Sequence, residues 1–307
     1  MMITKKGALI TGGSGLVGGH LTHVLKAQGY QVAHLSTRSN YIAPEGVAHF
    51  LWDPEKEYVD PEALEGISVI FHLAGATVSK RWTPSYKQEI LNSRIRSTQT
   101  LAKALRDYNH QVEAVISASA VGIYPSSKTH TYREEDENAH DFLGSVSQHW
   151  EKAVEKLGAD TSVRTAMLRI GIVLSRQGGV LQQMEPIFRI GLGAPLGCGK
   201  QWMSWIHADD LARQFLHVYE HSLTGVFNAG GPQPVINKEF SKQLAKAMHK
   251  PFLFPWRGVP GTLLKMALGE MATLALMSQK VSDEKIVAGG FSYQYPTLQS
   301  ALEQLYR

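Results

Sequence analysis

Residues 8–36, ALITGGSGLVGGHLTHVLKAQGYQVAHLS, hold the pattern that decides the fold. Two short apolar runs, 8–11 and 30–36, flank a glycine-rich turn and an amphipathic stretch, and each run predicts a buried strand. The stretch between them forms one helical stripe from Leu16, His20, Leu21, Val24 and Leu25. Gly29 follows it and is the residue type that commonly ends a helix. The sequence therefore predicts a strand, a glycine turn, a helix and a second strand.

The alternation of strands and helices continues along the chain. Further strands are predicted at 47–52, 67–75, 112–120 and 164–174, and helices at 84–107 and 145–157. Such alternation is typical of a parallel sheet covered by helices on both faces. We therefore predict the α/β class, with a doubly wound parallel sheet of the Rossmann type.

The second half of the chain has a less regular pattern. We predict a helix within 205–221 that is capped by Asp209 or Asp210, and a packed helix over the apolar stretch 262–277. The predicted domains are a Rossmann domain at 1–232, with elements of a substrate lobe interleaved from about residue 176, and a smaller mixed α/β C-terminal lobe at 233–307.

The composition excludes several classes of protein. Lys and Arg number 31 against 27 Asp and Glu, and no run of basic residues indicates a nucleic-acid partner. The single cysteine, Cys198, excludes a disulfide within the chain and is typical of a reducing cytosol. The stretch 262–277 is shorter than the about 20 apolar residues of a membrane span. We expect a cytoplasmic protein without a membrane partner and, because its histidine pairs lack a third ligand, without a metal site.

The glycine turn is the strongest chemical motif. Gly12, Gly15 and Gly18 follow the first strand and open the helix. Glycines there permit a sharp turn, let the backbone approach a pyrophosphate and let helix and strand pack closely. The helix N-terminus adds free N–H groups and a positive dipole end. The predicted dinucleotide contacts are Gly12, Gly13, Ser14, Gly15, Leu16, Val17 and Gly18; a glycine turn without a ligand is the alternative.

The residues after the second strand favour one of the two nicotinamide dinucleotides. An NAD site usually has an acidic residue here, which bonds the ribose 2′-OH. In this chain Thr37 and Arg38 follow the strand, and no acidic residue occurs before Glu45. A hydroxyl and a guanidinium suit a 2′-phosphate. We therefore predict NADP(H), with an ordinary surface arginine as the alternative.

Several longer motifs carry a family resemblance. They are TGGSGLVG at 11–18, HLAGA at 72–76, RWTPSYKQEILNSRIRST at 81–98, LRIGIVLS at 168–175, GLGAPLGCGKQWMSWIH at 191–207 and GGFSYQYPTLQSALEQL at 289–305. With these motifs the chain resembles the extended branch of the short-chain dehydrogenase/reductase superfamily. Within that branch it is similar to the NAD-dependent epimerase/dehydratase family, in the subgroup labelled cell-division-inhibitor-like nucleoside-diphosphate-sugar epimerase. The tail resembles a small C-terminal domain of unknown function found behind such Rossmann domains.

The resemblance implies which residues hold the cofactor and what the chain does. It maps the 2′-phosphate site onto Thr37 and Arg38. The further dinucleotide contacts that it implies are Leu73, Ala74, Glu89 and Arg94, with Val173 near the nicotinamide. Gly75, a small residue at the end of the fourth predicted strand, leaves room for the same ligand; packing of sheet and helix is the alternative. The implied function is an NADP(H)-dependent oxidoreductase or epimerase-like enzyme for a small carbonyl, alcohol or sugar-nucleotide substrate, with a homodimer as a further expectation.

One departure from the family pattern concerns proton transfer. Most members have Tyr-x-x-x-Lys after the fifth strand, where Tyr transfers a proton and Lys lowers its pKa. Leu143 and Ser147 occupy these positions here. The remaining catalytic candidates are Ser119 and, in the loop beyond, Tyr124. The alternative function is therefore a catalytically weak or inactive NADP(H)-binding sensor or scaffold.

Three tryptophans and the cysteine are candidates for substrate contacts. The resemblance places Trp82, Trp202 and Trp205 toward the substrate cleft, where they could stack on a ligand; packing in the core is the equally supported alternative. Cys198 lies in a Gly-Cys-Gly loop near Lys200, and its alternatives are a reactive thiol or a chance small residue.

Overall fold

A single eight-stranded sheet forms the centre of the molecule, in the order β12-β8-β6-β5-β1-β2-β3-β4. The computed structural model describes residues 6–254 and 258–307. The strands of this sheet are β1 Gly7–Thr11, β2 Gln31–Ser36, β3 Val47–Asp53, β4 Tyr58–Val59, β5 Ile67–His72, β6 Ala114–Ala120, β8 Arg164–Ile170 and β12 Gly225–Ala229. All neighbouring pairs are parallel except β3 and β4. The predicted doubly wound α/β fold is confirmed.

The strand order reverses at β1, because β2 lies on one side of it and β5 on the other. In a doubly wound sheet the crevice at the carboxyl ends of such neighbouring strands is where ligands bind. The glycine turn after β1, Thr37 after β2 and Leu73 after β5 all follow these carboxyl ends. The topology therefore brings the predicted cofactor contacts to one edge of the sheet.

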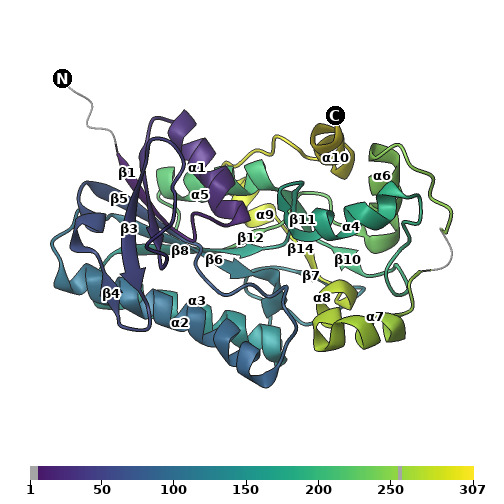
Figure 1. The fold of residues 1–307 in the computed structure, drawn as a ribbon, viewed down its shortest axis with the longest axis horizontal. Helices are drawn as coiled ribbons and strands as arrows, with labels where there is room; N and C mark the ends of the chain where they lie inside the picture. Colours follow the sequence, from purple (N-terminus) through teal and green to yellow (C-terminus); the bar gives the residue numbers. More distant parts are fainter. Residues whose placement is uncertain (1–5, 255–257) are drawn as a thin grey trace.

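Helices cover both faces of the sheet (Figure 1). α1 Leu16–Ala27 and α5 Ala208–Glu220 lie on one face, and α2 Pro84–Asp107 and α3 Phe142–Thr161 lie on the other. Side chains of each strand alternate between the two layers. Ile10 packs with Leu21 and Phe215 of the first layer, whereas Leu9 packs with Leu101 of the second. The buried strands therefore contribute side chains to a hydrophobic core on each face of the sheet.

The helix bounds follow from local capping chemistry. α2 begins at Pro84, as predicted, because the Thr83 side chain accepts the Tyr86 N–H and proline fits the first helical position. α3 begins three residues before the predicted start, since the Asp141 carboxylate accepts the Gly144 N–H. α5 begins at Ala208, and its cap is His207, which accepts the Asp209 N–H. The prediction that Asp209 or Asp210 caps this helix was wrong.

The predicted strand 164–174 divides at Gly171. β8 stays in the main sheet, whereas β9 Ile172–Ser175 pairs with β11 Trp205–His207. A Cβ atom at Gly171 would collide with the Ser204 carbonyl oxygen, so only glycine permits this close crossing. The edge strands β4 and β12 were not predicted, because each is too short or too mixed to show a clear period.

Elements that follow β9 build a third core. They are α4 Gly179–Arg189, β10 Trp202–Met203, β13 Val235–Ile236, α6 Asn237–Ala247 and α10 Leu298–Tyr306, and Leu181, Phe240 and Leu302 are among the residues that they bury together. β14 Lys280–Val281 and α9 Glu284–Ala288 lie outside this core, because their Val281 and Ile286 are buried in other clusters. β14 pairs with β7 Thr131–Tyr132, so the C-terminal part returns to the central region of the chain. The short 3-10 helices η1 Pro61–Leu64 and η2 Val121–Ile123 complete the described elements of the N-terminal half.

The apolar stretch 262–277 is not the single helix that was predicted. It contains α7 Gly261–Leu268, the 3-10 turn η3 Gly269–Met271 and α8 Ala272–Leu276. Gly269 has φ of 61°, a left-handed conformation that ends α7. Within the described residues, no helix is long and apolar enough to cross a membrane. The domain boundary near residue 232 stays a prediction, and residues 1–5 and 255–257 of the two predicted domains lie outside the described part.

Candidate dinucleotide site

The glycines of the turn between β1 and α1 differ in what surrounds them. Gly12 has φ of 71°, and its carbonyl accepts the Gly15 N–H at 2.9 Å. A Cβ atom on Gly18 would lie 2.5 Å from the Gly12 carbonyl oxygen, and one on Gly13 would lie 2.5 Å from the His34 ring. Gly15 is exposed, and a Cβ atom there would meet only the Gly12 oxygen, at 3.2 Å. Gly13 and Gly18 thus serve packing, and Gly15 faces open space.

The first turn of α1 offers its N–H groups without a competing partner. Gly15 is the N-cap, no side chain caps this helix in the described part of the chain, and its first turn holds no acidic residue. Ser14 is exposed, and Leu16 and Val17 are half-buried beside it. Free N–H groups at a helix N-terminus attract anions such as a pyrophosphate. The residues present therefore fit a dinucleotide phosphate group.

Neutral hydrogen bonds join the carboxyl ends of β1 and β5. The Thr11 hydroxyl oxygen accepts the N–H groups of Leu73 and Ala74 at 3.0 and 3.1 Å, so its single proton goes to His72 Nδ1 at 2.8 Å. His72 Nε2 then donates to the Thr98 hydroxyl at 3.0 Å. Burial, with a smaller effect of the Arg94 charge, lowers the pKa of His72 to about 3. The ring is therefore neutral, and the Thr11 hydroxyl beside it holds the half-buried Leu73 and Ala74 in place.

Arg94 from α2 lies against the segment that follows β5. Its Nη1 donates to the carbonyl oxygens of Ile90 and Ala76 at 2.8 and 3.1 Å, and its guanidinium is 4.9 Å from the Trp150 ring centroid. Burial lowers the pKa of Arg94 to about 10, so the side chain stays charged at neutral pH. A Cβ atom on Gly75 would lie 3.1 Å from this side chain. The structure thus brings Gly75 and Arg94 together, while Glu89 is exposed on the same helix.

The segment after β2 carries an exposed guanidinium. Thr37 and Arg38 are both exposed, and the Arg38 backbone N–H donates to the Ser36 hydroxyl at 3.1 Å. The Arg38 guanidinium carbon is 5.7 Å from the ring centroid of Tyr41. The charged group at this sheet edge is therefore a cation, as the sequence predicted.

The two catalytic candidates lie in a buried polar network at the end of β6. Ser119 is 3% exposed, and its hydroxyl donates to Glu151 Oε1 at 2.6 Å. Arg169 of β8 donates to both oxygens of Glu151, at 2.9 and 2.8 Å, and to the Tyr124 hydroxyl at 2.7 Å. Tyr124 donates in turn to Asn228 Oδ1 at 2.8 Å. One ion pair thus connects Ser119 with Tyr124.

The ionisation of this network follows from its burial. Burial opposes the charge of Arg169, but its hydrogen bonds to Glu151 and the charge of that carboxylate more than offset the burial, so the pKa of Arg169 is raised. Burial raises the pKa of Tyr124 to about 12, and the nearby Arg169 charge offsets only part of that rise. Tyr124 therefore keeps its proton at neutral pH. Leu143 and Ser147, at the usual tyrosine and lysine positions, are both buried in α3.

Comparison with known proteins decides the family. The model of the NAD dependent epimerase/dehydratase family matches residues 8–230, and that of a domain of unknown function, DUF1731, matches residues 259–305. The chain belongs to the NAD-dependent epimerase/dehydratase family. It is 38% identical over 299 residues to an epimerase family protein of Staphylococcus haemolyticus, covering 97% of this chain and 98% of the relative.

Solved structures of related proteins agree with this family membership. The human epimerase family protein SDR39U1, crystallised with NADPH, is 29% identical, has a TM-score of 0.84, and the match covers 98% of this chain and 99% of that one. A nucleoside-diphosphate sugar epimerase from Corynebacterium glutamicum is also 29% identical, with a TM-score of 0.76, over 98% of this chain and 58% of that protein. The resemblance to extended short-chain dehydrogenase/reductases is confirmed.

Glu151, Arg169 and Asn228 bond to the two catalytic candidates in this epimerase/dehydratase-family chain, and the sequence interpretation did not name them. Arg169 stands inside the apolar run of β8, and a charged residue in such a run is a signal of a buried ion pair. Its partner Glu151 gave no comparable signal, because acidic residues are common on helices. Val173, predicted near the nicotinamide, is half-buried in β9 beside Ile206 of β11.

The tryptophans differ in exposure. Trp205 is fully buried and donates from Nε1 to the Gln233 carbonyl oxygen at 2.8 Å, so it belongs to the core. Trp82 is largely buried, and Trp202 is half-buried with Lys280 Nζ 4.7 Å from its ring centroid. Cys198 is exposed, and its pKa is lowered mainly by a hydrogen bond from the Lys200 backbone.

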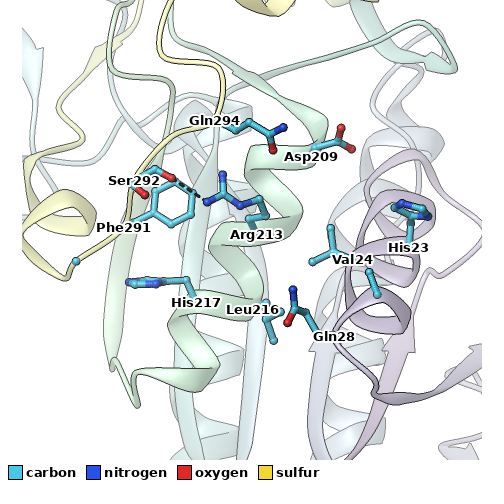
Figure 2. Close-up of a pocket in the computed structure, with 12 residues that line it drawn as sticks. His23, Val24, Gln28, Asp209, Arg213, Leu216, His217, Phe291, Ser292 and Gln294 are labelled. Carbon is cyan, nitrogen blue, oxygen red and sulfur yellow. Dashed lines mark hydrogen bonds between the residues drawn. The ribbon is translucent and has the colours of Figure 1, made fainter. Parts of the chain in front are cut away.

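A separate pocket of about 450 Å³ lies between α1, α5 and the segment 290–294 (Figure 2). Arg213 points into it from α5, and His23 and Val24 border it on α1. Two of the Arg213 donors already reach Asp210 Oδ1 at 2.8 Å and the Ser292 carbonyl oxygen at 3.1 Å. The cofactor and catalytic contacts predicted from the sequence are not among the described residues that line this pocket.

Proposed function

We propose that this chain binds NADP(H) at the β1–α1 turn and uses it in an oxidoreductase or epimerase-like reaction. The observation that carries the proposal is the guanidinium of Arg38 after β2, with no acidic residue before Glu45. A carboxylate there would repel a 2′-phosphate, whereas a guanidinium forms charge-assisted hydrogen bonds with it. The human relative crystallised with NADPH supports this choice of dinucleotide.

In the proposed site, residues after three strands contact different parts of the cofactor. The turn from Gly12 to Gly18 would hold the pyrophosphate, and Thr37 and Arg38 would hold the 2′-phosphate. The contacts proposed along the rest of the dinucleotide are Leu73, Ala74, Gly75, Glu89, Arg94 and, toward the nicotinamide, Val173. The bound cofactor supplies or accepts a hydride. The chain's own residues must then orient the substrate and provide for its proton.

We infer that the proton reaches the substrate from water. Neither Leu143 nor Ser147 can transfer one, and burial keeps the Tyr124 proton in place, with a pKa of about 12. The Ser119 proton is engaged with Glu151, but the serine oxygen can still accept a hydrogen bond from a water molecule whose other proton goes to the substrate oxygen. Ser119 would therefore orient this water, and catalysis would come mainly from positioning. Turnover should be slow.

A sensor or scaffold is the second candidate function. Leu143 and Ser147 at the usual proton-transfer positions favour it, because cofactor binding needs neither residue. For the enzyme, the proposed substrate is a small carbonyl, an alcohol or a sugar nucleotide. The proposed compartment is the cytosol, as the single cysteine suggests.

Oxidation of NADPH with a panel of aldehydes, ketones and keto sugars separates the two functions. We expect slow oxidation by the wild type, and a roughly ten- to hundred-fold lower rate for Ser119→Ala, the loss of one hydrogen bond worth about 1–3 kcal/mol. Tyr124→Phe removes the phenol and should have a smaller effect. An active wild type with both variants unchanged removes both residues from the mechanism. Tight NADPH binding without oxidation by any compound would favour the sensor.

A further inference from the structure

Tyr41, which no motif singled out, lies between the exposed Arg38 and the buried His34. Its ring centroid is 5.7 Å from the Arg38 guanidinium carbon, a distance typical of a cation–π contact. Its hydroxyl is 2.8 Å from His34 Nδ1. The backbone N–H of Tyr41 also donates to the Arg38 carbonyl oxygen at 3.2 Å, so a turn brings the two side chains together. Tyr41 is thus the contact between the cation and the interior.

The direction of the hydrogen bonds follows from counting protons. The Thr22 hydroxyl donates its single proton to the Gly18 carbonyl oxygen at 2.7 Å, so it must accept from His34 Nε2 at 2.8 Å. His34 Nδ1 is then an acceptor, and the Tyr41 hydroxyl donates to it. Burial, with a smaller effect of His49, lowers the pKa of His34 to about 4, which keeps this arrangement neutral. Each donor therefore meets an acceptor along the path from Thr22 of α1 through His34 to Tyr41.

The Tyr41 ring is held from a third side as well. It lies edge-on to His49, with ring centroids 5.2 Å apart and an interplanar angle of 80°. Burial raises the pKa of Tyr41, and the Arg38 charge offsets part of that rise, so the phenol stays a donor. His34 in turn packs under Gly13, whose Cβ atom, if present, would lie 2.5 Å from the imidazole. A continuous series of side-chain contacts therefore links the glycine turn to the segment that carries Arg38.

We propose that Tyr41 is a positioning residue that holds the Arg38 guanidinium at the carboxyl end of β2 and thereby strengthens selection of the 2′-phosphate. The proposal rests on the proposed binding of NADP(H). An arginine on an exposed segment loses side-chain freedom when it binds a phosphate, and an aromatic platform removes part of that cost beforehand. NADH has no 2′-phosphate, so its binding gains nothing from the platform. Tyr41 should therefore affect the ratio of the two affinities.

The test compares NADPH and NADH dissociation constants, measured by titration calorimetry, for the wild type, Tyr41→Leu, Tyr41→Phe and Arg38→Ala. Tyr41→Leu removes the ring and should weaken NADPH binding about two- to five-fold, the strength of an exposed cation–π contact. Its NADH affinity should not change. Tyr41→Phe keeps the platform and loses only the bond to His34, so it should retain most of the NADPH preference.

The double variant Arg38→Ala/Tyr41→Leu tests whether Tyr41 acts through Arg38. We expect it to bind NADPH no more weakly than Arg38→Ala alone, because the platform then has nothing to position. Equal losses of NADPH and NADH affinity in Tyr41→Leu would overturn the proposal and indicate general damage to the fold. If Arg38→Ala lowers NADPH affinity but Tyr41→Leu does not, the positioning role alone fails. If Arg38→Ala leaves the NADPH affinity unchanged, both the proposed 2′-phosphate contact and the positioning role of Tyr41 fail.

Discussion

The ends of β1, β2 and β5 differ in kind from the end of β6. At the first three, glycines and neutral hydrogen bonds shape an open edge, with Gly15 exposed and His72 tied to Thr11. At the end of β6, a buried ion pair of Glu151 and Arg169 engages the Ser119 hydroxyl. We call the ends of β1, β2 and β5 the cofactor end; its glycine turn is exposed. The end of β6, in contrast, is filled by buried side chains of the chain itself.

The proposed dinucleotide contacts and the family's proton-transfer positions therefore lie on separate elements of the fold. The proposed cofactor contacts come mainly from the first three strand ends and from α2. The proton-transfer positions of the family lie on α3, where this chain has Leu143 and Ser147. A chain can therefore retain the first set and lack the second.

Removing the carboxylate of Glu151 should have the largest effect. Glu151→Ala leaves the buried Arg169 without its ionic partner, so we expect the free energy of unfolding to fall by about 3–5 kcal/mol. NADPH affinity should stay unchanged at temperatures where the variant is folded. Urea denaturation followed by circular dichroism measures the first quantity, and calorimetry measures the second.

The matched control is Lys156→Ala on the same helix, which breaks an exposed ion pair with Asp160. Exposed pairs contribute little, so its urea midpoint should match that of the wild type. A loss of NADPH affinity in folded Glu151→Ala would show that the network at the end of β6 is coupled to the cofactor end, which would contradict their separation.

Gly15→Val should block the cofactor end and leave the fold intact. Gly15 has φ of −81°, a backbone conformation that any residue adopts, and a Cβ atom there requires only a small shift of the Gly12 carbonyl 3.2 Å away. The valine side chain would, however, stand where the pyrophosphate must approach. We expect NADPH affinity to fall about 100-fold, or about 3 kcal/mol, the strength of charge-assisted hydrogen bonds. Gly19→Ala is the control, because a Cβ atom there meets nothing within 4 Å. Normal NADPH binding by Gly15→Val would show that the site lies elsewhere.

Acid should destabilise the cofactor end through His72. Burial lowers the folded-state pKa of this ring to about 3, while the unfolded chain titrates near 6.5. The unfolded state therefore binds the proton first, and stability is lost as the pH falls below about 6.5. The loss between pH 7 and pH 5 should be about 2 kcal/mol for this histidine.

His72→Asn should reduce that dependence, as seen in urea denaturation at pH 5, 6 and 7. His149→Asn, on the exposed face of α3, should not. An unchanged slope in His72→Asn would mean that the ring is not buried as a neutral group.

Local signals explain why much of the fold could be predicted. α2 has the predicted bounds because Thr83 and Pro84 mark its start chemically. The break at Gly171 depends on the approach of Ser204, which lies 33 residues away (204 minus 171), and no local pattern reports such a contact. The edge strand β12 is likewise defined by its pairing with β8 and not by its own period.

Part of the candidate site could likewise be predicted from local sequence, and part could not. Arg38 and the glycine turn are read directly from the residues that follow two strands. The pairing of Glu151 with Arg169, and of Tyr124 with Asn228, joins residues 18 and 104 positions apart. Such partners are set by packing of separate elements, so the sequence could name Ser119 and Tyr124 as candidates but not the network that engages them.

The central claim is that the cation after β2 selects NADP(H), and one titration tests it most directly. Calorimetry of the wild-type chain with NADPH and with NADH should give affinities that differ by about 10- to 100-fold in favour of NADPH, as expected for one charge-assisted contact of about 1.5–3 kcal/mol. Arg38→Ala should bring the two affinities close together. Equal affinity of the wild type for NADPH and NADH would contradict the account.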